Sequence, residues 1–397
     1  MVAKMDFLKK INTDSLLWTG FCGMFFFLPV MTPATAYCAV LVAAAWILSG
    51  RFVKDIPSFW KAGIALPMIF FVILPWIGLI YAPNFSQGFP VAWKTRYWVL
   101  PVALIPVISL RKRPDFLLKM FLSGLSLNSV IAIMQYAGLL RDEGFATGLV
   151  GGASPWISFS LLLTMGILIA SYYAGVAQSG KGRTIYLCAV LLFFITIGCA
   201  GGRSGYLALI LLFPLMVYNI LGRKHMLRII AGSIVGISLL FAFPVVRARV
   251  YRGVEDIEMY RQGNIDTSLG LRFHMWGIAL EEIKDNPLIG MGTGGFREAW
   301  AEHKGDPSLP YYDHPHNSFI YMMVSFGIPG LLSFCWLLYV MLKRGWRGRR
   351  SPIGFAVFVF TMVFIIGSMT DTELYPFAMS TALPLFAGMS EAVRDEC

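Results

Sequence analysis

Apolar runs long enough to cross a lipid bilayer recur along almost the whole chain, and they limit its fold more than any other feature. A transmembrane helix needs about 20 predominantly apolar residues. The sequence predicts twelve spans, at residues 16–31, 34–49, 62–81, 97–109, 116–140, 155–177, 184–200, 204–221, 227–245, 318–342, 353–370 and 374–392. Charged residues make up only 14% of the 397, against roughly 25% in soluble chains. We therefore expect an all-α polytopic membrane protein whose first partner is the lipid bilayer.

The distribution of positive charge orients these spans. If the N-terminus lies on the inner side, most of the 33 Lys and Arg residues fall in inner loops and tails, as the positive-inside rule requires. The net charge of +11 is then a consequence of membrane topology, so we expect no nucleic acid partner. The cysteines lie in spans or at the C-terminus, which predicts neither a disulfide framework nor a thiolate metal site.

One long polar stretch interrupts the apolar pattern and divides the chain into three parts. We expect residues 1–245 to form nine spans, residues 246–317 to form a folded loop on the outer side, and residues 318–397 to form three spans and a short tail. Half of the 22 acidic residues lie in this loop. Charge spacing predicts an amphipathic helix over 247–261 lying on the membrane. Capping residues predict a second helix that starts at residues 266–268 and ends at Asn286.

Arg203 lies between two apolar spans, in the sequence Gly-Gly-Arg-Ser-Gly. A helix that starts near Ser204 would direct its free backbone N–H groups and the Arg203 guanidinium at one point. This arrangement is typical of phosphate binding. The alternative is an arginine that merely extends its charged end to the membrane surface.

The long loop contains a second candidate arginine and a glycine-rich turn. Arg272 and Trp276 are four residues apart and share one face of the predicted helix, although Arg272 could instead pair with an acid of the loop. The segment 290–296 has the pattern Gly-x-Gly-x-Gly-Gly-Phe. It lacks the preceding strand and the Lys-Ser/Thr of a nucleotide-binding loop, so ATP and NAD are excluded. We expect these glycines to let the loop turn tightly against the membrane face, where Phe296 inserts.

A His-Pro-His-Asn sequence directly precedes the tenth span. A helix N-terminus disfavours a charged imidazole, so His316 is expected to stay neutral and able to accept a proton as a general base. The pair His314 and His316 could also be metal ligands, but no third and fourth ligands are evident beyond Asp313. A buried, hydrogen-bonded structural histidine is the other alternative.

Two further basic residues, Lys94 and Arg96, lie in the outer turn between the third and fourth spans, flanked by Trp93 and Trp98. Aromatic residues anchor helices at the membrane interface. The two cations either share in this anchoring or contact an anionic lipid headgroup.

In their order along the chain, these motifs resemble the O-antigen ligase superfamily, which also contains O-antigen polymerases and bacterial protein O-oligosaccharyltransferases. The resemblance rests on Gly201–Gly205, the Arg272-x-x-x-Trp276 helix, the glycine turn and the His316-Asn317 pair; many relatives have Ser-Arg-Gly around the first arginine. It implies a glycosyltransferase of the bacterial inner membrane. Such an enzyme moves O-antigen polysaccharide from undecaprenyl diphosphate to a sugar hydroxyl of lipid A–core on the periplasmic face, with inversion and without a metal or other cofactor.

The resemblance also assigns roles to residues. It gives Arg203 and Arg272 to the diphosphate and His316 to the acceptor. Substrate-binding positions are then expected at His314, Asn317, Trp276, Lys94 and Arg96.

Three alternatives remain at this stage. A polymerase and a protein-glycosylating enzyme belong to the same superfamily, and the short segment after the last span favours a ligase over the latter. A transporter or flippase is the alternative from another class. Such proteins typically have internal repeats and ionisable residues near mid-span, and neither is evident in this sequence.

Overall fold

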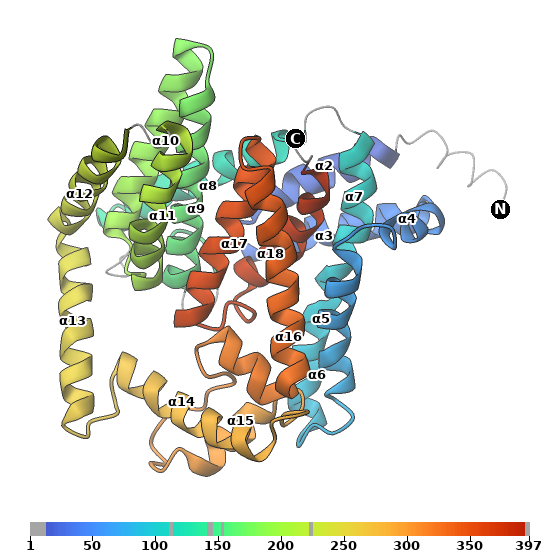
Figure 1. Cartoon of the computed structure of the whole chain (residues 1–397), viewed down its shortest axis with the longest axis vertical. Coiled ribbons are helices and arrows are strands. Elements are labelled where there is room, and N and C mark those ends of the chain that lie inside the picture. The colour runs from blue at the N-terminus through green and yellow to red at the C-terminus, as the bar shows by residue number, and fades with distance from the viewer. Residues whose placement is uncertain (1–12, 111–113, 141–145, 152–154, 222–224, 394–397) are drawn as a thin grey trace.

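The computed structural model describes residues 13–110, 114–140, 146–151, 155–221 and 225–393. Within these ranges every regular element is a helix and no strand occurs, which confirms the all-α prediction. Most of the helices pack into an elongated bundle; α14 and α15 lie across its lower end in Figure 1, and α13 runs down one side toward them.

Each predicted span contains a helix at nearly the expected position. These helices are α2 (Thr13–Phe27), α3 (Thr32–Leu48), α5 (Ala65–Ile77), α7 (Leu100–Leu110), α8 (Phe116–Tyr136), α9 (Pro155–Val176), α10 (Gly180–Cys199), α11 (Arg203–Leu221), α12 (Met226–Ala242), α16 (Ser318–Arg347), α17 (Pro352–Thr370) and α18 (Phe377–Met389). Among the described residues, six helices are long and apolar enough to cross a membrane, or up to eight if each bent pair is one span. The polytopic class is confirmed, whereas the number twelve stays a prediction.

Two helices next to the third span were not predicted. Helix α4 (Phe52–Phe59) follows α3 after a bend of 105°. Helix α6 (Phe85–Trp93) begins at Asn84, whose side chain accepts a hydrogen bond from the Gln87 amide. Helix α4 is short and contains a proline.

Helix α6 continues through a 3-10 segment, Lys94–Val99, into α7, and residues 85–109 together form one of the candidate spans. The predicted fourth span therefore begins earlier than expected, and Lys94 and Arg96 lie within this helical run and not in a turn before it.

Helix α9 is the centre of the bundle, since nearly all of its residues are buried. It packs against α10, α11 and α17. Close approach of α11 depends on Gly202 and Gly205. A Cβ atom added at these positions would lie 2.1 Å and 2.5 Å from side-chain atoms of Ser160 on α9. The glycines around Arg203 therefore fix where α11 begins.

The long loop folds around a small core that also includes Val324, at the start of the helix that follows the loop. It contains α13 (Pro244–Arg261), α14 (Ser268–Asp285) and α15 (Gly295–His303). The second predicted helix is confirmed as α14, and the Thr267 hydroxyl accepts a hydrogen bond of 3.0 Å from the Gly270 amide at its start. The prediction for Phe296 was wrong. This side chain is fully buried in the loop core, with Met275 and Trp300, because α15 turns it toward α14.

The loop is joined to the bundle where α16 is broken. At Gly327 the backbone has a φ of 61° and a ψ of −154°, which is not helical. The loop segment 287–293 fills this break: the Ile328 amide bonds the Pro287 carbonyl at 3.0 Å, and Met291 and Gly292 donate to the carbonyls of Val324 and Ser325, each at 2.9 Å. Buried backbone groups need such partners, so the break and the loop stabilise each other.

The glycine turn makes this docking possible. Gly290, Gly292 and Gly294 all have positive φ angles of 67°, 84° and 84°, which favour glycine. Thr293, between Gly292 and Gly294, donates from its hydroxyl to the Pro75 carbonyl at 2.6 Å and from its amide to the Gly78 carbonyl at 3.1 Å. The predicted tight turn against the membrane helices is confirmed, at the end of α5.

We expect Gly327→Ala to destabilise the protein more than Gly50→Ala. Both glycines have positive φ, 61° and 68°, so each alanine costs about 1–2 kcal/mol in backbone strain. Only at Gly327 would the new Cβ also meet backbone, 2.4 Å from the Leu288 carbonyl group, whereas nothing lies within 4 Å at Gly50. Thermal unfolding of the detergent-solubilised variants measures the difference. Equal shifts in the two midpoints would show that docking of the loop does not depend on this contact.

Candidate active site

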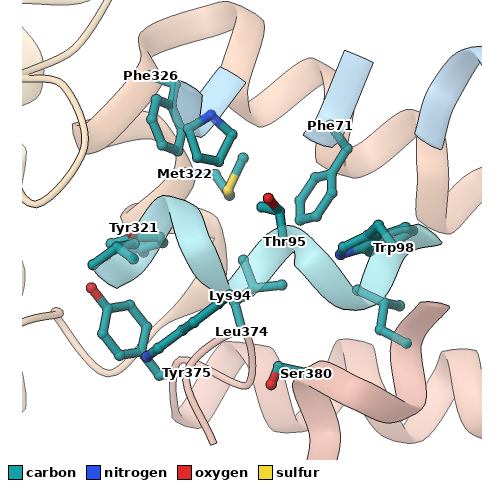
Figure 2. A pocket seen from close by; sticks show the side chains of 13 residues that line it. Phe71, Lys94, Thr95, Trp98, Tyr321, Met322, Phe326, Leu374, Tyr375 and Ser380 are labelled. Atoms are coloured by element: carbon teal, nitrogen blue, oxygen red, sulfur yellow. The ribbon is translucent and has the colours of Figure 1, made fainter. Parts of the chain in front are cut away.

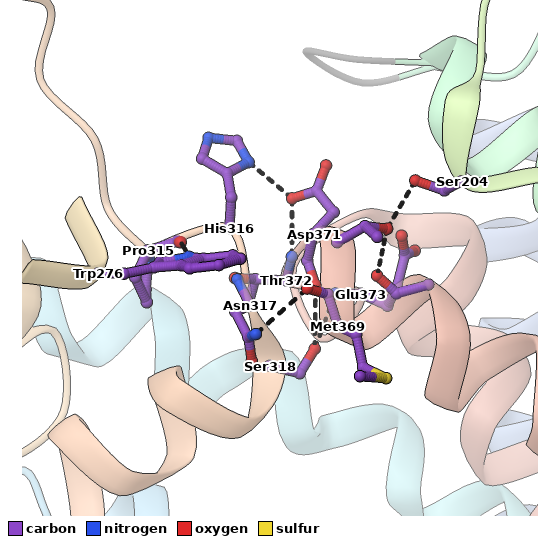
Figure 3. A network of polar contacts seen from close by, with 12 residues as sticks. Ser204, Trp276, Pro315, His316, Asn317, Ser318, Met369, Asp371, Thr372 and Glu373 are labelled. Atoms are coloured by element: carbon purple, nitrogen blue, oxygen red, sulfur yellow. Dashed lines mark hydrogen bonds and ion pairs between the residues drawn. The ribbon is translucent and has the colours of Figure 1, made fainter. Parts of the chain in front are cut away.

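Two loops meet beside the start of α16: the segment 313–317 and the segment 371–376 after α17 (Figure 3). Asn317 links them. Its side-chain oxygen accepts hydrogen bonds from the amides of Phe319 and Ile320 and so caps α16. Its own amide donates to the Thr372 hydroxyl at 3.0 Å, and its side-chain nitrogen donates to the Met369 carbonyl at 3.2 Å. In this structure Asn317 therefore positions the residues on either side of it.

His316 lies at the centre of this junction. Its Nδ1 atom is 2.7 Å from Oδ1 of Asp371. Since a carboxylate accepts hydrogen bonds, Nδ1 carries a hydrogen, and in the neutral imidazole this tautomer leaves the lone pair on Nε2. His316 also has a φ of 52°, the one positive value for a non-glycine residue in the described ranges. Strained backbone of this kind concentrates at functional sites.

Asp371 is the residue of this candidate site that the sequence prediction missed. It lies 55 residues from His316 along the chain and its side chain is only 5% exposed. Burial alone would raise the pKa of Asp371, but the hydrogen bond to His316 and the positive charge of Arg272 lower it. The carboxyl is therefore ionised and holds the imidazole in one orientation. A signal was present, because Asp371 and Glu373 interrupt two apolar spans.

The two predicted arginines lie in the same region but differ in their partners. Both terminal nitrogens of Arg203 contact Oδ2 of Asp256, at 3.1 Å and 3.2 Å. Arg272 is half-buried and has no hydrogen bond or ion pair with any residue that the structure describes. Burial lowers the pKa of Arg272, and the charges of Asp371, Arg203 and Asp256 all act on it. Arg272 thus lies within electrostatic range of both the Arg203–Asp256 pair and Asp371, with no acceptor for its donors among the described residues.

The expected phosphate cradle at the start of α11 is only partly formed by backbone. The amides of Gly205 and Tyr206 already bond the Gly202 carbonyl, at 3.2 Å and 3.4 Å. What α11 offers a ligand is therefore mainly the Arg203 side chain at its first position.

Trp276 supports the histidine segment from α14. Its indole N–H donates to the Pro315 carbonyl at 2.8 Å, and its ring packs on Phe273 with centroids 5.7 Å apart. The shared face of Arg272 and Trp276 thus brings one residue to the charged region and the other to the turn that presents His316.

His314 lies next to His316, with ring centroids 4.7 Å apart, and next to Tyr375, at 4.4 Å. Burial lowers the pKa of His314 to about 3, and the neighbouring His316 adds to this effect. His314 therefore stays neutral at physiological pH. Its Nδ1 atom is buried and has no hydrogen-bond partner among the residues described.

A metal ion could use three of these groups. His314, His316 and Asp371 place ligand atoms within 4.8 Å of one another. Asp313, considered from the sequence as a ligand, is instead paired with Arg297 at 2.9 Å. The bond between His316 and Asp371 already joins two of the three groups directly, as expected of a histidine oriented by a carboxylate.

Lys94 borders the site from the bundle side. Its ammonium lies 3.7 Å from the centre of the Tyr375 ring and has no acceptor in the described part of the chain. It lines a largely apolar pocket between α5, α16 and α18 that also contains Thr95, Tyr321 and Ser380 (Figure 2). Arg96 is exposed and bonds the Trp93 carbonyl at 2.9 Å, within its own turn. The structure brings Lys94, but not Arg96, next to the histidines.

Glu373 is fully buried beside this network, and neither of its carboxyl oxygens has a hydrogen-bond partner within the described ranges. Burial raises the pKa of Glu373 well above its ordinary value, and the negative charge of Asp371 raises it further. A buried acid without a partner is more stable when neutral.

We therefore expect Glu373→Gln to raise the thermal unfolding midpoint near pH 7. Because the folded-state pKa is raised, the contribution of Glu373 is fully present below about pH 4.3, the usual value for an unfolded chain, and is lost as the pH rises. The gain from the glutamine should shrink as the pH falls toward 4. Unfolding midpoints between pH 4 and 8 test this, with the exposed Glu281→Gln as control. Parallel curves for wild type and Glu373→Gln would contradict it.

Comparison with known proteins adds to this geometry. Residues 188–335 match the family model described as O-antigen ligase. This range includes Arg203, Arg272 and His316, whereas Lys94 and Asp371 lie outside it.

Three relatives are similar over part of the chain. A putative polysaccharide ligase of Rickettsia conorii is 26% identical over 201 residues, which cover 47% of this chain and 47% of the relative. The exopolysaccharide production protein ExoQ of Rhizobium meliloti is 28% identical over 163 residues, or 36% and 37%. An uncharacterized protein of Haemophilus influenzae is 26% identical over 188 residues, or 44% and 45%. The chain thus spans less than half the length of each relative. The resemblance predicted from the ordered motifs is confirmed: residues 188–335 match the O-antigen ligase family model, and two of the relatives are named for polysaccharide ligation or production.

Proposed function

We propose that this protein is a ligase-type glycosyltransferase. It transfers O-antigen polysaccharide from undecaprenyl diphosphate to a sugar hydroxyl of lipid A–core, on the periplasmic face of the bacterial inner membrane. The observation that carries the proposal is His316, which Asp371 orients at 2.7 Å, beside Arg272, a guanidinium without a partner among the described residues. The family match supports it, since Arg203, Arg272 and His316 all lie in the matched residues.

The donor half of the reaction explains the arginines. When the bond between the anomeric carbon and the diphosphate oxygen breaks, the bonding electrons remain on the diphosphate. The developing negative charge must be stabilised, and preorganised donors in a site shielded from water do this best. Guanidinium groups bind phosphate oxygens through two parallel hydrogen bonds, so Arg272 and Arg203 are suited to the leaving diphosphate.

The acceptor half explains the histidine. The acceptor hydroxyl attacks the anomeric carbon from the side opposite the leaving group, which inverts the configuration. Its proton passes to Nε2 of His316, and Asp371 stabilises the imidazolium that forms. The proton then leaves to solvent, since the His316 side chain is 17% exposed. General-base catalysis of this kind is typically worth about 10²–10⁴-fold.

Lys94 and its pocket suit the acceptor. An ammonium over the face of Tyr375, with no hydrogen-bond acceptor among the described residues, is suited to bind an anionic group, and the apolar lining beside it suits a lipid. We place the acceptor on this side of His316 and the donor on the side of the two arginines.

Replacing His316, the proposed base, should strongly reduce transfer while the protein still folds. In a purified system with lipid-linked polysaccharide and lipid A–core, His316→Ala should reduce the rate by about 10²-fold or more. His303→Ala is the matched control, because His303 also belongs to the long loop but lies on its exposed surface, 3.5 Å from Glu282. The assay is run with and without EDTA. Undiminished transfer by His316→Ala would refute the base assignment, and loss of wild-type activity in EDTA would favour the metal alternative.

Replacing Arg272 tests the proposed binding of the donor diphosphate. Arg272→Lys keeps the positive charge but loses the planar fork that binds two phosphate oxygens at once. We expect kcat to fall by at least about tenfold, a loss of roughly 1.4 kcal/mol of transition-state stabilisation. Lys284→Arg at the other end of α14 serves as control. Wild-type kinetics for Arg272→Lys would argue against binding of the diphosphate by this residue.

The choice between ligase and polymerase is best tested in cells. The exopolysaccharide relative keeps the polymerase as the second candidate. If the gene is deleted, a ligase predicts free lipid-linked polymer and bare lipid A–core on a lipopolysaccharide gel. Core carrying a single repeat unit would instead identify a polymerase.

A further inference from the structure

Helix α13 presents one particular face to Arg203. Val246, Arg249, Gly253 and Asp256 follow one another at spacings of three or four residues, so they share one side of the helix, and none of them is exposed. The opposite side is open to the surroundings; Tyr251 and Val254, for example, are 67% and 63% exposed. The sequence predicted an amphipathic helix in this region. The structure adds that one face of this helix, α13, is directed toward Arg203.

This contact is built around the Arg203 guanidinium. Gly253 leaves room for it, because a Cβ atom there would lie only 3.2 Å from Nη1 of Arg203. Both terminal nitrogens then reach the same oxygen of Asp256, at 3.1 Å and 3.2 Å. The donors that would bind a phosphate oxygen are thus occupied by a carboxylate oxygen of the chain itself.

Asp256 lies in a region that has more guanidinium groups than carboxylates. Arg249 lies within electrostatic range of both Arg203 and Asp256, and Arg272 is within range of both as well. Asp371 also lies within range of Arg272, so two carboxylates serve this region with three guanidinium groups, and Asp371 already accepts a hydrogen bond from His316. A diphosphate carries more negative charge than one carboxylate, and it can also engage Arg272, which has no acceptor among the described residues.

We propose that Asp256 is an internal competitor for the diphosphate: it occupies Arg203 when no donor is bound and is displaced when a lipid diphosphate binds. This inference rests on the proposed function. Only an anion that gains more from the arginines than Asp256 does can exchange with it, so Asp256 sets a threshold that favours diphosphates over weaker anions.

The ends of α13 allow such an exchange. The helix begins directly after a bend of 89° from α12, at Pro244. It is followed by Gly263, which has a φ of 89°. Figure 1 shows α13 at one side of the molecule, joined to α12 at one end and to the segment before α14 at the other, and its contacts are mainly with α14, with fewer to α10 and α11. A small rotation about these two ends would withdraw Asp256 from Arg203 while the rest of the loop stays docked on α16.

The test measures binding of inorganic pyrophosphate to the purified full-length protein by calorimetry. Asp256→Asn should lower the Kd by about fivefold or more, because the ligand no longer displaces an ion pair worth roughly 1 kcal/mol. Glu255→Gln removes the same charge from the neighbouring exposed position and should change the Kd by less than about twofold. In an Arg203→Ala background, Asp256→Asn should have no effect, because the competition requires both residues. Asp256→Ala is measured alongside, so that failure of one variant to fold leaves the test intact.

Two results would overturn the inference alone. An unchanged or weaker Kd in both Asp256 variants would mean that this residue only positions Arg203. Equal tightening in the Arg203→Ala background would mean a general effect of charge. In either case, loss of pyrophosphate binding in Arg272→Ala would leave the proposed function standing. If wild type and every variant fail to bind pyrophosphate, the diphosphate site and the inference fail together.

Discussion

The break in α16 at Gly327 is the constraint on which the rest of the structure depends. A helix that crosses a membrane must satisfy its backbone groups internally or against other protein. The break leaves the carbonyls of Val324 and Ser325 to be satisfied by the amides of Met291 and Gly292. The long loop is therefore fixed to the bundle by backbone hydrogen bonds. Everything that the loop brings to the site, including Arg272 and the histidine segment, is positioned by this joint.

The candidate site is shared between the bundle and the long loop. The bundle contributes Arg203 at the start of α11 and Asp371 at the end of α17, and the long loop contributes Arg272 and His316. The two carboxyl groups of the segment 371–373 differ in their protonation states. Asp371 is ionised and holds a histidine, whereas Glu373, two residues later, is buried without a partner and favours its neutral form. Two carboxyl groups in one short segment thus have different protonation states because their surroundings differ.

The sequence was sufficient for the fold class, the helix positions and the family, because apolar runs, caps and ordered motifs are local signals. Helix α14 was predicted from Thr267 and Asn286 almost to the residue. Contacts between distant segments were not predictable in this way. Asp256 lies 53 residues from Arg203 and Asp371 lies 55 from His316, and no periodicity connects them. Phe296 was misplaced for the same reason: its burial depends on how α15 packs against α14, which the glycine pattern does not specify.

The central claim is that a lipid diphosphate binds between Arg203 and Arg272, within reach of a histidine that acts as base. A structure of the protein with a non-hydrolysable lipid diphosphate donor tests it most directly. The account predicts phosphate oxygens within hydrogen-bond distance of both guanidinium groups, and a His316 that still donates to Asp371. Diphosphate density beyond the reach of Arg272, or a metal ion bound by His314, His316 and Asp371, would contradict it.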